Sequence, residues 1–267
     1  MIIGIDVGAT TTKAVSIEGG RLTRKVKIKA SDAVTAATGA LGKIVLENGI
    51  PMNFIERIKI TGAGSLKIKN NIFGIPTSSI DEIKAIGTGG MFLSGMENII
   101  IANIGTGTAI IEANKQGISH FGGSGVGGGT ILGLAKKLLP TNEFSDIIEL
   151  AETGSLSRVD LLLEDIMETD MSFLRKNTTI ANFAKMSDNA TGADIALAII
   201  NMVYQVIGIL AVFAARAKNI KRVIVTGNGS SNKLGQKVLT EITGLYGIEF
   251  IYPADAEYTT AVGAGLA

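Results

Sequence analysis

The stretch Met1-Ile2-Ile3-Gly4-Ile5-Asp6-Val7-Gly8-Ala9-Thr10-Thr11-Thr12-Lys13 decides how the rest of the chain is interpreted. An apolar run ends in Asp6, a glycine turn and three threonines follow, and a second apolar run begins after Lys13. This pattern predicts strands over 2–6 and 12–17, joined by a short polar hairpin. Backbone N–H groups, hydroxyls and an ammonium suit a phosphate, and an aspartate at the start of the loop suits Mg²⁺. A plain hairpin with polar turn residues is the alternative for this stretch alone.

A related loop recurs about 95 residues later, at Ala102-Asn103-Ile104-Gly105-Thr106-Gly107-Thr108. It again separates two apolar runs, which predict strands over 98–104 and 107–113. The repeat favours phosphate binding over two unrelated polar turns. Two copies of the unit also predict two related α/β halves that face each other, with the ligand where their turns converge.

Two further glycine-rich segments predict ligand contacts. Gly122-Gly123-Ser124-Gly125-Val126-Gly127-Gly128-Gly129-Thr130 leads directly into an apolar helical pattern, which would place free N–H groups at the positive end of a helix and form an anion site. Its spacing differs from that of a GxxxxGK[ST] phosphate loop. Ile224-Val225-Thr226-Gly227-Asn228-Gly229 ends a buried strand and suits a nucleotide base or ribose, although an ordinary turn between strand and helix explains it equally well.

Asp81 and Glu82 are the candidate carboxylates for proton transfer. Phosphoryl transfer to an alcohol is assisted by a carboxylate near the acceptor hydroxyl. Both residues open a predicted helix after Pro76-Thr77-Ser78-Ser79. Carboxylates in the first turn of a helix are also favourable end charges, so this simpler role stays open.

Composition narrows the class of protein. The chain has 267 residues, enough for one large domain or two ordinary ones, and is 46% hydrophobic but only 18% charged. With a net charge of +1 and no arginine-rich patch, binding to nucleic acid or to an anionic membrane is not expected. The absence of cysteine excludes disulfides, thiolate metal sites and iron–sulfur clusters. No secretory signal pattern is visible at the N-terminus, so we expect a cytoplasmic protein.

The uncharged segment 195–215 is long enough to span a bilayer. Its interior polar residues, Asn201, Tyr204 and Gln205, favour a buried or interface helix over a membrane span. The remaining pattern predicts strands over 23–28, 57–61, 222–227 and 248–252. It also predicts helices over 34–47 with Ser31 as N-cap, from Ser79 or Asp81 to Ser94, after Gly129, and over 143–152, 156–170, 194–218 and 232–245, with a last one from Thr259.

Taken in order, these motifs resemble the type II pantothenate kinase family, within the superfamily of acetate and sugar kinases, heat-shock ATPases and actin. The matching segments are Gly4–Thr10 with Lys13, Ala102–Thr108, Gly122–Thr130 with Gly133-Leu134, Asp160–Ile166, Thr179–Phe183, and Tyr258 with Ala261–Ala264. The resemblance implies an α/β fold of two ribonuclease H-like (actin-like ATPase) lobes facing a nucleotide cleft, here divided into 1–96 and 97–267. It implies ATP-dependent phosphorylation of the primary hydroxyl of pantothenate, the first step of coenzyme A biosynthesis, by a homodimer that uses Mg²⁺.

The resemblance also assigns roles to residues. Glu82 would be the catalytic general base, and Asp6 would hold Mg²⁺ through water. The ATP phosphates and nucleoside would contact Gly8, Thr10, Lys13, Gly105, Thr106, Gly107, Thr108, Gly127, Gly128, Gly129, Gly227, Asn228 and Gly229. Pantothenate would contact His120, Gly122, Thr130 and Tyr258. Two positions depart from the family pattern: His120 replaces an arginine that grips the pantothenate carboxylate, and Lys84 replaces an acidic residue. A neutral imidazole binds a carboxylate less well than a guanidinium does.

These departures keep other functions open. The chain could be a kinase of another small alcohol or a sugar, or a non-catalytic ATP-binding regulatory protein. Activator ATPases of radical dehydratases share the superfamily, but their iron–sulfur cluster needs cysteines, which this chain lacks. We expect the 195–215 helix to form the subunit contact, so charges placed at Ile200 or Val203 should separate the dimer.

Overall fold

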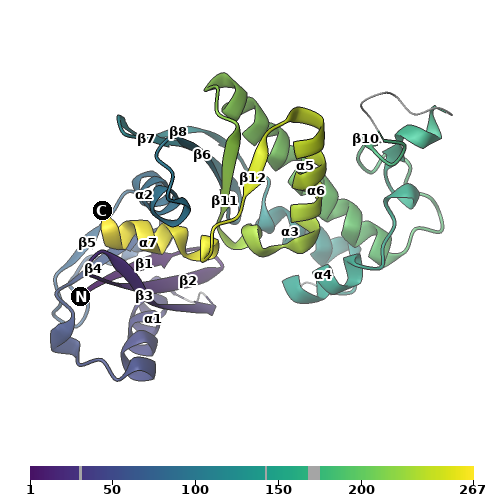
Figure 1. The fold of residues 1–267 in the computed structure, drawn as a ribbon. Helices are drawn as coiled ribbons and strands as arrows, with labels where there is room; N and C mark the ends of the chain where they lie inside the picture. The colour runs from purple at the N-terminus through teal and green to yellow at the C-terminus, as the bar shows by residue number, and fades with distance from the viewer. Residues whose placement is uncertain (30–31, 142, 168–174) are drawn as a thin grey trace.

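The computed structural model describes residues 1–29, 32–141, 143–167 and 175–267. Two five-stranded sheets form two lobes (Figure 1), which confirms the predicted two-lobed α/β fold. The first sheet has the order β3-β2-β1-β4-β5 and the second has the order β12-β11-β6-β7-β8. Their strands are β1 Ile2–Val7, β2 Thr11–Glu18, β3 Arg21–Lys29, β4 Arg57–Thr61, β5 Thr77–Ser79, β6 Ile99–Ile104, β7 Thr108–Asn114, β8 Gly117–Ser124, β11 Arg222–Thr226 and β12 Glu249–Ile251.

The two sheets are built in the same way. In each, a central strand (β1 or β6) pairs antiparallel with the next strand in the chain and parallel with a later one (β4 or β11). The polar turns after β1 and β6 and the glycine turns after β4 and β11 therefore emerge at matching edges. The predicted relation between the two halves is confirmed at the level of strand order and pairing.

Helix α1, Ala33–Asn48, covers the outer face of the first sheet. Asp32 is its N-cap, because its Oδ1 accepts hydrogen bonds from the N–H groups of Val34 and Thr35. The predicted cap, Ser31, lies outside the described residues. The helix ends at Gly49 in the left-handed conformation, a common helix stop.

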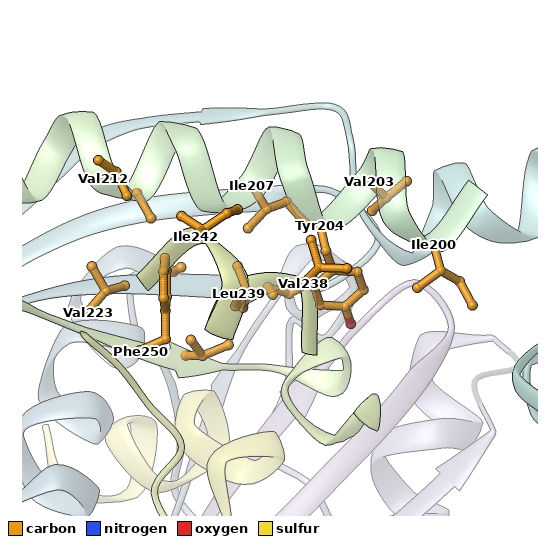
Figure 2. Close-up of a cluster of buried hydrophobic side chains, with 14 of the residues drawn as sticks. Ile200, Val203, Tyr204, Ile207, Val212, Val223, Val238, Leu239, Ile242 and Phe250 are labelled. Atoms are coloured by element: carbon orange, nitrogen blue, oxygen red, sulfur yellow. The ribbon is translucent and has the colours of Figure 1, made fainter. Parts of the chain in front are cut away.

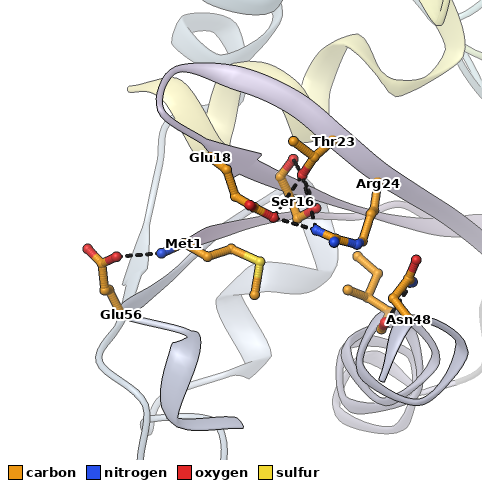
Figure 3. Close-up of polar contacts among 8 residues, drawn as sticks. Met1, Ser16, Glu18, Thr23, Arg24, Asn48 and Glu56 are labelled. Atoms are coloured by element: carbon orange, nitrogen blue, oxygen red, sulfur yellow. Dashed lines mark hydrogen bonds and ion pairs between the residues drawn. The ribbon is translucent and has the colours of Figure 1, made fainter. Parts of the chain in front are cut away.

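At the end of the first sheet that lies away from the turn between β1 and β2, two ion pairs connect neighbouring segments (Figure 3). The N-terminal ammonium of Met1 pairs with Glu56, and Arg24 pairs with Glu18. An open groove of about 860 Å³ lies beside these pairs. Its lining includes Glu18, Arg24 and Glu56 but none of the predicted phosphate-loop residues.

Helices α2, Glu82–Ser94, and α7, Thr259–Leu266, join the lobes (Figure 1). Side chains of the second sheet pack on α2, and those of the first sheet pack on α7. The two helices cross with backbone contact, since a Cβ at Gly89 would overlap the carbonyl of Thr259 and one at Gly263 would overlap that of Ala85. The C-terminal helix thus covers the N-terminal sheet, and the division of the chain at 96/97 stays a prediction.

Helix α5, Gly192–Ala217, is the one described helix whose length and apolar composition would allow it to cross a bilayer, and 61% of its apolar window is buried in the fold. Figure 2 shows its inner face packed on α6, Lys233–Tyr246. Ile200 and Val203 are fully buried there, so the prediction that charges at these positions would separate a dimer is wrong: they would disrupt the core. The large apolar side chains that α5 exposes are Val206 and Phe213.

The predicted helix over 156–170 is also wrong as far as residue 167, and residues 168–170 lie outside the described part of the chain. The segment forms short turns at Leu156–Arg158 and Leu163–Asp165 and strand β9, Leu161–Leu162, which pairs with β10, Thr179–Ala181. The buried carboxylate of Asp160 explains the difference. It accepts hydrogen bonds from the backbone of Phe183 and the side chains of Thr179 and Asn201, which fix the chain in a non-helical path.

Two further helices complete the second lobe. They are α3, Gly128–Leu138, and α4, Phe144–Ala151, which follow the glycine loop as the sequence predicts. The glycine segment itself begins inside strand β8, which the sequence does not predict.

Candidate active site

A cavity of about 380 Å³ lies where the turns of both sheets meet. The first lobe contributes the loop after β1 and the turn after β4, and the second lobe contributes the loop after β6 and the turn after β11. The predicted residues in its lining are Asp6, Gly8, Thr10, Lys13, Glu82, Gly105, Thr106, Gly107, Thr108, Gly227 and Asn228. Segments more than 200 residues apart in the chain therefore share one site.

Asp6 and Lys13 are cross-strand partners on β1 and β2. Burial raises the pKa of Asp6 to about 6, the nearby ammonium of Lys13 opposes this rise, and the charge of Glu82 adds to it. Burial likewise lowers the pKa of Lys13, and the charge of Asp6 opposes that change. Lys13 is only 4% exposed, so both charges are held in a site of low solvation where an incoming ion interacts strongly.

Glu82 opens α2 and faces the same cavity. The neighbouring Asp81 is the N-cap, because its Oδ1 accepts a hydrogen bond from the N–H of Lys84. Asp81 thus caps the helix, whereas Glu82 lines the cavity. Partial desolvation raises the pKa of Glu82, and the adjacent charge of Asp81 raises it further, which favours proton uptake.

The loop after β6 is supported by the glycine segment that begins α3. Gly128 and Gly129 donate their N–H groups to the carbonyls of Gly105 and Thr106. A Cβ at Gly127 would approach the carbonyl of Thr106 to 2.6 Å, so only glycine allows the two loops to lie this close. These N–H groups already have acceptors within the protein, and direct phosphate binding by Gly127, Gly128 and Gly129 stays a prediction.

A second cavity of about 280 Å³ adjoins the first. The two share Thr10, Thr11, Gly105, Thr106 and Asn228 in their linings. The second cavity is more apolar and includes Ile131, Leu132, Phe144 and the ring of Tyr204, together with the predicted Gly128, Gly129 and Gly229. A polar cavity joined to an apolar one fits a molecule with a charged chain at one end and a flat base at the other.

Asn228 connects the lobes at the junction of these cavities. Its Nδ2 donates a hydrogen bond to the Oγ1 of Thr11 at 3.1 Å. Its buried Oδ1 has no partner among the described residues. A buried acceptor without a partner is costly, so this atom is available to a donor on a bound ligand.

The predicted acceptor-binding residues lie apart from both linings. His120 is on β8, where it pairs with Ile111, and Gly122 lies on the same strand. The Oγ1 of Thr130 accepts the N–H of Gly127 and so caps α3. Tyr258 is buried before α7. Their contact with a substrate therefore stays a prediction.

Several lining residues were missed by the sequence prediction: Thr11, Gly62, Ala63, Asn103 and Thr260. A usable signal existed for Gly62. The segment Thr61-Gly62-Ala63-Gly64 repeats Thr226-Gly227-Asn228-Gly229. Thr61 pairs with Asp6 as Thr226 pairs with Asn103, so both segments occupy the same place in their sheets.

The residues present fit a magnesium ion bound together with a nucleotide. The described residues contain no group of three or more His, Cys, Asp or Glu side chains that could hold a metal by themselves. Mg²⁺ commonly binds one or two carboxylates plus substrate phosphates, and Asp6 and Glu82 both line the cavity. The hydroxyl of Thr61 is buried at the register position of Asp6 and lacks a partner among the described residues.

Comparison with known proteins agrees with this geometry. The chain is 30% identical to a type II pantothenate kinase of Bacillus cereus over 98% of this chain and 96% of that protein. Among solved structures, it is similar to component A of the (R)-2-hydroxyglutaryl-CoA dehydratase of Acidaminococcus fermentans. That match has a TM-score of 0.70 at 20% identity and covers 99% of this chain and 96% of that one. A glucokinase of the ROK family from Streptomyces griseus, in complex with glucose and AMPPNP, gives a TM-score of 0.59 at 13% identity, with coverage of 99% and 97%.

The two structural neighbours establish the fold. The family follows from the sequence, since the profile of the Fumble family matches residues 97–264 and thereby more than half of the chain. Its curated relatives match nearly end to end. With its predicted phosphate loops and Glu82 gathered in one cleft, the chain belongs to the Fumble family of type II pantothenate kinases.

Proposed function

We propose that this protein transfers the terminal phosphoryl group of ATP to the primary hydroxyl of pantothenate, the first step of coenzyme A biosynthesis. The observation that carries the proposal is that Glu82 lines the same cavity as the phosphate loops of both lobes. A carboxylate facing bound phosphates is the arrangement that phosphoryl transfer to an alcohol requires. The name of the curated relatives supports pantothenate as the acceptor.

In this mechanism the protein supplies position and charge. Glu82 accepts the proton of the acceptor hydroxyl as its oxygen forms a bond to the terminal phosphorus and the bond to the ADP oxygen breaks. The ammonium of Lys13 stabilises negative charge on the phosphates in a site of low solvation. Mg²⁺, held through Asp6, would neutralise phosphate oxygens. Thr10 and Thr108 line the cavity; the hydroxyl of Thr10 orients the phosphate chain, whereas that of Thr108 donates to the carbonyl of Val126.

The apolar cavity takes the nucleoside in this proposal. Ile131, Leu132 and Phe144 provide faces for a base, and Asn228 and Gly229 bound the ribose side. The acceptor lies on the Glu82 side of the first cavity. His120, Gly122, Thr130 and Tyr258 remain our predicted contacts for its far end. Because His120 stands where the resemblance expects arginine, a small alcohol other than pantothenate is the second candidate.

The test is a coupled assay of ADP release with MgATP and a panel of acceptors: pantothenate, shorter hydroxy amides and simple sugars. Pantothenate should give the highest kcat/KM. Turnover with a sugar alone would refute the proposed acceptor. ATP binding without release of ADP for any acceptor would instead indicate a regulatory ATP-binding protein. Omission of Mg²⁺ should abolish turnover.

We also propose that the active form is a cytoplasmic homodimer that associates through α5. Phe213 is 58% exposed and Val206 is 37% exposed on this helix, an unusual exposure for large apolar side chains. The change Phe213→Asp should convert a dimer to a monomer in light scattering at micromolar concentration, without lowering the melting temperature of the protomer. Leu46→Asp, on the exposed face of α1, is the matched control. A wild-type protein that is already monomeric would refute the dimer.

A further inference from the structure

A lysine outside all of the sequence motifs lies at the proposed nucleotide cavity. Lys27 is on β3 and lines the apolar cavity of about 280 Å³. It is the only charged residue among the described residues of that lining. It is also the cross-strand partner of Lys13, so the two lysines project from the same face of the first sheet. One lysine lines each cavity.

The arrangement of the two cavities indicates which part of a bound nucleotide would lie beside Lys27. Lys13 lines the cavity of Glu82, where the terminal phosphate must lie for transfer. Lys27 lines the cavity of Phe144, where the base fits. Between them lie the shared residues, including Thr11 and Asn228. A nucleotide that spans both cavities would place the phosphate nearest the ribose at this junction, which Lys27 borders from the nucleoside side.

The ammonium of Lys27 is available for such a contact. Its Nζ lies 2.6 Å from the Oε2 of Glu257, but the two side chains are 42% and 30% exposed. An exposed ion pair of this kind contributes little to stability, so a phosphate with more negative charge competes well for the ammonium.

We propose that Lys27 is a nucleotide-binding residue that contacts the phosphate nearest the ribose. The inference rests on the proposed function only in that a nucleotide occupies the two joined cavities. It concerns neither the acceptor nor the transfer step. It predicts that part of the affinity for ATP, ADP and AMP depends on Lys27, whereas affinity for adenosine does not.

The chain supplies a matched control in Lys25. It lies two residues earlier on β3, projects from the same face, and pairs with Asp255. It lines neither of the two cavities. Loss of Lys25 therefore removes the same charge and a similar ion pair without removing a group from the nucleotide site.

The experiment measures dissociation constants for ATP, ADP, AMP and adenosine by displacement of a fluorescent nucleotide. Lys27→Met should weaken ATP, ADP and AMP by about 10- to 100-fold, the effect of losing a charged hydrogen bond, and leave adenosine within about twofold. Lys27→Arg should retain most of the affinity. Lys25→Met should leave all four constants close to those of the wild type. In turnover, Lys27→Met should raise KM for ATP more than it lowers kcat.

Three results would overturn the inference: unchanged ATP affinity in Lys27→Met, equal weakening in Lys25→Met, or equal weakening of adenosine and AMP. The results that would refute the proposed kinase activity differ from these three. A wild type that binds ATP but phosphorylates no acceptor refutes that activity and still allows the Lys27 comparison. A wild type that binds no nucleotide overturns both.

Discussion

The hairpins β1–β2 and β6–β7 share one backbone plan but differ in charge. Asp6 and Asn103 occupy matching positions at the ends of the central strands. Each lies beside a Thr-Gly pair on the parallel neighbour, and the glycines, Gly62 and Gly227, have φ values of 84° and 80°. In the first hairpin the cross-strand partner of Asp6 is Lys13, whereas in the second the cross-strand partner of Asn103 is Ala109. The repeated frame is thus charged in one copy and neutral in the other.

The hydroxyls of the two copies differ in the same sense. Thr226 donates to Asn103 and Thr108 donates to the carbonyl of Val126, so the second copy satisfies its buried hydroxyls. The equivalent Thr61 and Thr12 have no partner among the described residues. Buried polar groups without hydrogen-bond partners, which most of a fold avoids, are commonly found at functional sites. The ionisable side chains and the unpartnered hydroxyls of the repeated frame thus lie in the first copy, whereas the second copy is neutral and internally hydrogen-bonded.

The largest effect should come from Glu82→Gln. Loss of the general base should lower kcat by about 10²- to 10⁴-fold, with ATP affinity nearly unchanged. Asp81→Asn is the matched control, because asparagine also caps a helix and should leave kcat within a few-fold. Both are measured by acceptor-dependent ADP release. Unchanged turnover in Glu82→Gln would remove the base from the proposed mechanism.

Asn103→Asp makes the second copy resemble the first. The new carboxylate keeps the hydrogen bond from Thr226, but it is a partly buried charge with no lysine partner across the hairpin. We expect a loss of about 2–4 kcal/mol in the free energy of unfolding at pH 7, measured by urea denaturation. The loss should shrink at acidic pH, where the carboxylate is protonated. A neutral effect at pH 7 would mean that the second copy tolerates charge as well as the first.

Asp6→Asn makes the first copy resemble the second and should lower magnesium-dependent turnover, but by less than Glu82→Gln does. Whereas Asn103→Asp should lower the free energy of unfolding at pH 7, Asp6→Asn should raise it. The pKa of Asp6 rises on folding from 3.8 to about 6 because of burial, so the folded state binds more protons than the unfolded state between these values. Wild-type stability should therefore fall as pH rises through this window.

Without Mg²⁺ and nucleotide, Asp6→Asn should match the wild type in stability below pH 4. It should exceed the wild type by about 2–3 kcal/mol at pH 7. Denaturation curves at pH 4, 5, 6 and 7 measure this difference. A gap that stays constant with pH would show that the carboxylate is not destabilised by burial.

The smallest effect should come from the two turn glycines. A Cβ at Gly62 would lie 2.6 Å from the Oδ1 of Asp6, and one at Gly227 would lie 2.5 Å from the carbonyl of Ile104. Alanine at either position should cost about 2 kcal/mol of stability. Gly49→Ala, with positive φ but open space around it, should cost about half as much. Only Gly62→Ala should also lower kcat, because it displaces the carboxylate of Asp6.

The sequence predicted both hairpins, the approximate start of α2 and most helices, because polar turns and apolar periodicity are local properties. It did not predict β8, since Gly122 to Gly125 offers almost no side-chain alternation from which to recognise a strand. A Cβ at Gly123 would lie 2.5 Å from the carbonyl of Thr108, so this strand needs glycine for its close pairing with β7. The same glycines that indicated a ligand loop therefore serve strand pairing.

Other features depended on contacts between distant residues. The apolar periodicity of 156–167 is overridden by the hydrogen bonds of Asp160 to residues about 20 to 40 positions later. Lys27 and Phe144 reach the apolar cavity from separate lobes, and nothing in their neighbouring sequence marks them. Of the site, the loops were predictable as motifs, whereas the residues that connect them needed the fold.

The crossing of α2 and α7 limits how the protein can move. Main chain touches main chain at Gly89 and Gly263, with no side chain between them to slide or change rotamer. Such a contact fixes the point at which the two helices cross, so a change in the angle between the lobes must be accommodated around it. Glu82 begins α2 and turns with the second sheet, whereas Asp6 and Lys13 turn with the first. The angle of this crossing thus sets the distance from Glu82 to Asp6 and Lys13 across the cavity, although neither glycine is part of the cavity lining.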